Sequence, residues 1–111
     1  MKKREIIRRT KDFELIFNNG QREKNKDLTI IYFRHPQNKI NRFAFLISKK
    51  VSKKAHERNL LKRRLKAICD ELNFKEKGYD LVFIPRPSLL KKKFSELKEI
   101  TEKLLRQASL I

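Results

Sequence analysis

The chain has 111 residues, of which 39% are hydrophobic and 39% are charged, and its formal net charge is +17. This length fits one domain with a modest core, and so large a charge requires an anionic partner, either a nucleic acid or an anionic membrane. A membrane protein and a secreted protein are disfavoured, because no apolar run approaches the ~20 residues of a spanning helix and no apolar segment follows the basic start at Met1–Arg4.

The first nine residues are strongly basic. Residues 1–9 contain five Lys or Arg and a single acid, Glu5. Like charges in so short a segment repel one another and are typical of an interaction tail. We therefore expect residues 1–9 to form a mobile basic arm that RNA could order, separate from a single domain at residues 10–111.

Thr10–Asn19 is predicted to form a short helix, with Thr10 as its N-cap and Gly20 as its stop. Phe13 and Phe17 share one face of this helix. Two aromatic residues in this pattern usually belong to a core. The alternative is a wall on which an unpaired base stacks.

Two strands are expected next. Gln21–Asp27 is polar and basic and fits a loop or a short edge strand, whereas Leu28–Arg34 is β-branched and aromatic and predicts a strand covered on both faces. After a turn, Arg42–Ser48 predicts a hairpin partner for Leu28–Arg34. Because side chains alternate along a strand, Ile31 and Phe33 share one face and Tyr32 lies on the other. The sequence does not say which face would hold a ligand.

A basic helix follows, from about Ala55 to Asn73. Its apolar residues fall at i, i+4, i+7 and i+11, and its opposite face is basic. Between Lys49 and Lys66 there are nine Lys or Arg and one acid, Glu57, so the i,i+4 pairs that balance an ordinary surface helix are missing. A solvated basic helix is the simpler reading, but this imbalance favours a phosphate-binding surface.

The C-terminal part predicts a strand at Tyr79–Pro85 and a last helix capped by Ser88 or Ser95. This helix is balanced in charge and amphipathic, so we expect it to cover the sheet. The order helix, strands, basic helix, strand, helix predicts an α+β fold, a two-layer sandwich around a mixed sheet.

The basic stretch also resembles a known family. Ser48–Val51, then Ala55–Asn59, then Lys62 and Arg63 resemble the signature of the protein subunit of bacterial ribonuclease P. That family carries a Ser-Lys-Lys lead-in and an Arg-Asn-Arg motif followed two residues later by Lys-Arg, and its order of elements fits nearly the whole chain. Leu60 replaces the second Arg of the motif, so the family's contact at that position does not carry over.

The resemblance implies a left-handed crossover at the basic helix, although sheet geometry alone favours a right-handed one. It implies a cleft for the single-stranded 5′ leader of precursor tRNA, with Phe13, Phe17, Ile31 and Phe33 as candidate contacts. It also implies a catalytic RNA partner that carries the active site and its Mg²⁺. The candidate RNA-binding residues are Lys49, Lys50, Lys53, Lys54, Arg58, Asn59, Lys62, Arg63 and Lys66.

The sequence offers no catalytic or metal-binding constellation of its own. Neither histidine has a neighbouring carboxylate in a recognisable arrangement, and Asp12, Asp70 and Asp80 are scattered over three elements. The lone Cys69 allows no internal disulfide, fits a reducing cytoplasm and is expected to be a core residue rather than a catalytic thiol. We therefore expect no cleavage by the protein alone.

Three functions follow from these features. The first is a protein component of a cytoplasmic ribonucleoprotein that matures tRNA 5′ ends, with a catalytic RNA and precursor tRNA as partners and no membrane. The second is a structural RNA-binding protein of the ribosomal type. The third is a stand-alone metal-dependent nuclease, which would require the scattered carboxylates to converge. Stimulation of a catalytic RNA, or cleavage without RNA, discriminates among them.

Overall fold

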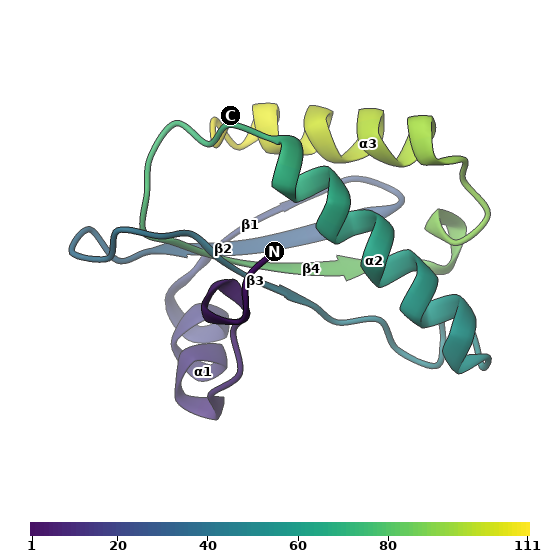
Figure 1. The fold of residues 1–111 in the computed structure, drawn as a ribbon, viewed down its shortest axis with the longest axis horizontal. Helices are drawn as coiled ribbons and strands as arrows, with labels where there is room; N and C mark the ends of the chain where they lie inside the picture. The colour runs from purple at the N-terminus through teal and green to yellow at the C-terminus, as the bar shows by residue number, and fades with distance from the viewer.

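A computed structural model describes residues 1–111 and contains three helices packed on one four-stranded sheet. Helices α2 and α3 cover one face of the sheet and α1 lies on the other (Figure 1). None of the helices is long and apolar enough to cross a bilayer. The α+β class and the mixed sheet are confirmed, and α1 adds a partial third layer to the expected two-layer sandwich. In chain order the elements are η1 (Lys3–Glu5), α1 (Thr10–Asn19), β1 (Gln21–Lys24), β2 (Leu28–Arg34), β3 (Arg42–Phe45), α2 (Ala55–Glu71), β4 (Tyr79–Pro85), η2 (Pro87–Leu89) and α3 (Phe94–Gln107).

The strand order is β1-β2-β4-β3, so the predicted hairpin between β2 and β3 is wrong. Strand β4 lies between them, antiparallel to β2 over seven residue pairs and parallel to β3 over four. The longest and most apolar strands occupy the centre because only there are both faces covered. The polar segment β1 forms an antiparallel edge strand, as one of the two alternatives expected.

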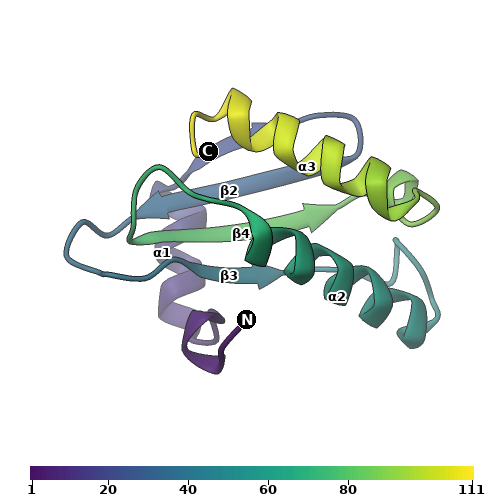
Figure 2. The same ribbon diagram turned by 45° about the horizontal axis from the view of Figure 1, so that its top comes forward.

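The connection from β3 through α2 to β4 is left-handed. In Figure 2 both strands run to the right, β4 lies above β3, and α2 passes in front of the sheet. A right-handed connection would place β4 below β3 in this view. The handedness implied by the family resemblance is thus found, against the usual preference for parallel strands.

Two apolar clusters hold the layers together. The larger one fills the space between the sheet and α2 and α3, and it includes Leu61, Leu65 and Ile68 from the predicted apolar face of α2. The smaller one lies under α1 and consists of Ile7, Ile16, Ile31, Ala44 and Val82. The apolar faces of the central strands therefore point to both layers, as their near-continuous hydrophobicity predicts.

The expected mobile arm at residues 1–9 is not what the structure contains. Ile7 is 4% exposed, its N–H donates to the carbonyl of Phe43 at 2.9 Å, and Ile6 forms a parallel bridge with Phe43. Two adjacent isoleucines within the basic segment can bury apolar surface, and their backbone covers the free edge of β3. The N-terminal residues therefore belong to the folded domain.

Helix ends differ in part from the prediction. Gly20 ends α1 with an extended φ of −74°, and a β-carbon there would collide with the carbonyl oxygens of Ile16 and Tyr32. Neither serine caps α3, because the cap residue is Lys93, whose N–H donates to the Glu96 carboxylate at 3.2 Å.

Candidate nucleic-acid interface

The outer face of α2 carries a row of cations without partners. His56, Asn59, Lys62, Arg63 and Lys66 line one shallow depression that contains no hydrophobic residue. None of the nine Lys or Arg between residues 49 and 66 forms an ion pair, whereas Lys98 and Arg106 on α3 pair with Glu71 and Glu102. Unpaired cations in a row are available to phosphates without first breaking an internal contact.

The segment before α2 is held in a fixed shape by Ser52. The Ser52 hydroxyl donates to the Glu57 carboxylate at 2.5 Å and accepts the Lys54 N–H at 3.1 Å. The hydrogen bond from Ser52 lowers the pKa of Glu57, so the only acid of the stretch is bound by a hydroxyl. Arg58 donates to the Ser52 carbonyl at 2.8 Å and is therefore partly structural rather than wholly free for RNA. Four lysines of this segment, Lys49, Lys50, Lys53 and Lys54, are exposed.

A second group of cations lies at the same end of the sheet as the segment before α2. This group was not identified from the sequence. The β1–β2 turn and the segment after β4 are joined there, because Asp27 accepts the Ser88 hydroxyl at 2.6 Å and its carbonyl accepts the Arg86 N–H at 2.9 Å. The β3–α2 segment reaches this end too, because β3 and β4 are parallel (Figure 2). The sequence feature that could have revealed this group is the absence of acidic residues between Pro85 and Glu96. The exposed cations of this second group are Lys24, Lys26, Arg86, Lys91 and Lys93.

The candidate leader contacts lie on the face of the sheet that α1 covers. The rings of Phe13 and Phe17 stack with centroids 6.4 Å apart, and Phe17 is 37% exposed. Phe33 packs against the smaller apolar cluster under α1, which contains Ile31. The strand face that carries Ile31 and Phe33 is therefore the one that meets α1. Ile31, however, is 0% exposed beneath α1 and has no surface for a ligand.

More exposed positions on that face lie two residues further along the strands. Thr29 pairs in register with Ile84 on one side and Lys24 on the other, and both Thr29 and Ile84 are half-buried. Leu46, just after β3, is 39% exposed. These positions were missed because their exposure depends on how far α1 extends across the sheet.

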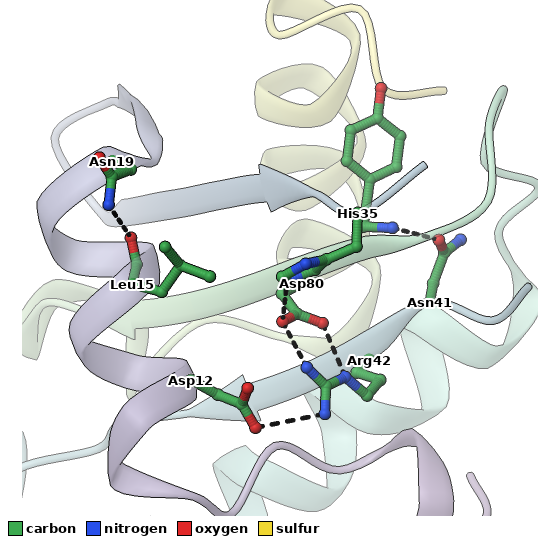
Figure 3. Close-up of polar contacts among 8 residues, drawn as sticks. Asp12, Leu15, Asn19, His35, Asn41, Arg42 and Asp80 are labelled. Atoms are coloured by element: carbon green, nitrogen blue, oxygen red, sulfur yellow. Dashed lines mark hydrogen bonds and ion pairs between the residues drawn. The ribbon is translucent and has the colours of Figure 1, made fainter. Parts of the chain in front are cut away.

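Two of the scattered carboxylates do approach each other, but they surround an arginine. Asp80 accepts Arg42 Nε at 2.8 Å and Nη2 at 2.6 Å, and Asp12 accepts Arg42 Nη1 at 3.3 Å (Figure 3). The hydrogen bond to Asp80 raises the pKa of Arg42, which favours the charged form of its guanidinium. Asp70 lies elsewhere and pairs with the N-terminal amine. No group of three or more His, Cys, Asp or Glu side chains is placed so that it could hold a metal ion.

Cys69 is buried against the main core, and burial raises the pKa of its thiol. A thiol that stays protonated is a poor nucleophile. We expect iodoacetamide at about pH 8 to leave Cys69 unmodified in the native protein and to alkylate it once denaturant unfolds the chain. Mass spectrometry of the two samples checks this, and rapid alkylation of the native protein would contradict the inert core assignment.

The whole chain is similar to proteins of one kind. The family model described as Ribonuclease P matches residues 1–109. A "Ribonuclease P protein component" of Caldanaerobacter subterraneus is 32% identical over 94% of this chain and 89% of its own length. One of Leuconostoc citreum is also 32% identical, over 100% of this chain and 96% of its own length.

Solved structures agree in fold. An RNase P protein from Thermotoga maritima superposes with a TM-score of 0.80 at 29% identity, covering 93% of this chain and 96% of that one. The Staphylococcus aureus RNase P protein superposes with a TM-score of 0.85 at 19% identity, covering 96% of each chain. The likeness therefore extends over the sheet and all three helices.

Proposed function

This chain belongs to the ribonuclease P protein family, and from that premise we propose how it serves as the protein component of the ribonuclease P ribonucleoprotein in the endonucleolytic maturation of tRNA 5′ ends. The observation that carries the proposal is the row of unpaired cations on α2 and on the segment before it. A purely structural RNA binder of the ribosomal type would use the same cations, but the family match favours ribonuclease P.

The basic face of α2 is the surface for the catalytic RNA. Lys62, Arg63 and Lys66 supply charge to phosphates, and Asn59 supplies a directional hydrogen bond to a phosphate or a 2′-hydroxyl. The lysines at residues 49–54 extend this surface on a fixed backbone, because Ser52 holds the segment against α2. The cations around Arg86 continue it to the end of the sheet.

The face beside α1 is the surface for the 5′ leader. Phe17 and the half-buried Phe13 offer aromatic rings on which unpaired bases stack. Thr29, Ile84 and Leu46 provide a flat, mostly apolar floor next to α1, with Lys24 at its edge. This arrangement suits a single strand better than a duplex, because its contacts go to base faces rather than to a groove.

The protein contributes position and electrostatics rather than reacting groups. The catalytic centre and its Mg²⁺ belong to the RNA subunit in this proposal, and the protein holds the precursor tRNA in register with them. Its cations also lower the repulsion between two RNA molecules, which lets the RNA site bind Mg²⁺ at lower concentration. We place this activity in the cytoplasm, in keeping with the free Cys69.

Cleavage of a precursor tRNA by the cognate catalytic RNA at low Mg²⁺, with and without the protein, tests the function. We expect the protein to raise the rate at the mature 5′ end, and to raise it more for a substrate with a leader of several nucleotides. Binding to RNA without any change in cleavage would favour the structural RNA binder instead.

Phe17→Ala tests the leader surface. Loss of one stacking ring should weaken binding of a substrate with a long leader about fivefold, since stacking on an aromatic side chain contributes about 1 kcal/mol or more per base. Phe94→Ala is the matched control, because Phe94 is 39% exposed on α3, on the other layer. Equal effects of the two substitutions, measured as dissociation constants of the holoenzyme, would contradict the assignment.

A further inference from the structure

Arg42 forms a polar junction between the sheet and α1. Its register partner on β4 is Asp80, so both side chains emerge side by side on the α1 face of the sheet. The Arg42 guanidinium donates two hydrogen bonds to the Asp80 carboxylate, at 2.8 and 2.6 Å. It donates a third, at 3.3 Å, to Asp12 in the first turn of α1 (Figure 3). His35 Nε2 lies 3.0 Å from Asp80 Oδ2 and completes the junction from the end of β2.

This junction is fixed on its sheet side. Asp80 is 1% exposed, and the planar guanidinium of Arg42 donates to both of its carboxylate oxygens. Arg42 is therefore held by the sheet whether or not α1 is in place. Its remaining nitrogen points to α1, where Asp12 is the acceptor.

Apart from this bond, α1 packs on the sheet through apolar side chains, the buried Ile16 and the half-buried Phe13. Ile16 is the only residue of α1 that is buried, and it enters a cluster of five aliphatic side chains. Apolar packing lacks the fixed donor and acceptor geometry of a hydrogen bond, so a hydrogen bond adds a directional constraint on the rotation of this ten-residue helix. The Asp12–Arg42 hydrogen bond is the one side-chain hydrogen bond between α1 and the sheet.

The position of this bond matters for the proposed leader surface. Asp12 immediately precedes Phe13, and Phe17 follows one helical turn later. A rotation of α1 about its axis would therefore move both rings relative to the floor at Thr29 and Ile84. A bond at the first turn opposes that rotation directly.

We propose that Arg42 and Asp12 are positioning residues for leader binding: the Arg42–Asp12 hydrogen bond sets the rotation of α1 and so places the Phe13–Phe17 pair over the sheet. This inference rests on the proposed function, since it concerns the same leader surface. Neither residue contacts the RNA in this role, and their effect passes through the two aromatic rings.

The test compares Asp12→Asn with Glu102→Gln in the holoenzyme reconstituted with the cognate catalytic RNA. Each change removes one carboxylate charge from an arginine pair, and the two carboxylate side chains are similarly exposed, at 22% and 20%. Substrates with a leader of several nucleotides and with one nucleotide are compared by KM and kcat. Asp12→Asn leaves the Arg42–Asp80 fork intact, so the protein should fold.

We expect Asp12→Asn to raise KM about fivefold for the long leader and to leave kcat and the short leader unchanged, because the amide oxygen that remains accepts from Arg42 about half as strongly as a carboxylate does. Arg42→Lys should act in the same direction, because an ammonium cannot bridge two carboxylates in the same fork. Removal of a negative charge by itself would strengthen RNA binding, so a general charge effect has the opposite sign and appears equally in Glu102→Gln.

A readout without RNA is available because the chain contains no tryptophan. In a Phe17→Trp background, Asp12→Asn should change the fluorescence and acrylamide quenching of the single indole, and Glu102→Gln should not. Unchanged quenching, or a leader dependence that survives Asp12→Asn, would overturn the positioning role. Absence of any leader dependence in the unsubstituted protein would instead overturn the leader contact itself.

Discussion

Replacing Lys62, Arg63 and Lys66 together with alanine should weaken binding of the catalytic RNA about 100-fold at moderate salt. Each lost phosphate contact contributes about 1 kcal/mol or more, and none of these cations has an internal partner whose loss would disturb the fold. Alanine is also the best helix former, so α2 should persist. Affinity measured by filter binding over a range of salt concentrations gives the result.

The salt dependence distinguishes direct contacts from a general loss of charge. Three fewer phosphate contacts should reduce the slope of log K against log salt by about 2 to 3. The control is the triple change of Lys98, Lys103 and Arg106 to alanine, which removes the same charge from α3, where two of the three cations already pair with acids. An equal loss of affinity and slope in both proteins would show that α2 is not a specific surface.

The second large effect is on stability. Asp80→Ala should lower the free energy of unfolding by about 3 kcal/mol, because it leaves the half-buried guanidinium of Arg42 with one distant acceptor and removes the partner of His35. Urea denaturation followed by circular dichroism measures the change. An unfolding free energy within about 0.5 kcal/mol of the parent would contradict this account of the junction.

A paired substitution separates lost charge pairing from lost packing. Replacing both residues, with Arg42→Met and Asp80→Leu, removes the two charges together and fills their space with apolar side chains. Buried ion pairs can be replaced in this way at little cost or with a gain. We therefore expect the double variant to be more stable than Asp80→Ala. It should still lose leader-dependent binding, because Asp12 no longer has a donor on the sheet.

Elements whose ends are set by nearby residues were predicted correctly from the sequence. The bounds of α1, β2 and β4 were predicted correctly because Gly20, the polar segment before Leu28 and Arg86–Pro87 are local signals that act within a few residues. The apolar face of α2 followed from its helical period for the same reason. The N-cap of α3 was predicted at a serine but lies at Lys93, where the nearby Glu96 accepts the backbone N–H. Ile6 and Ile7 pack on Phe43, a distant contact that the local pattern of residues 1–9 does not encode.

Local patterns in the sequence predicted the helices, most strand bounds and the basic face of α2, and the ordered Ser-Lys-Lys and Arg-Asn motif indicated the family. Three features became visible only in the folded chain: β4 separates β2 from β3, Ile31 is covered while Thr29 and Ile84 are partly exposed, and Arg42 bonds to both Asp12 and Asp80. The physical reason is the separation along the chain between the residues that interact. Helical periodicity and turn chemistry are encoded in neighbouring residues, whereas strand order, exposure and ion pairing arise from distant segments, such as the N-terminal amine and Asp70, which are 69 positions apart.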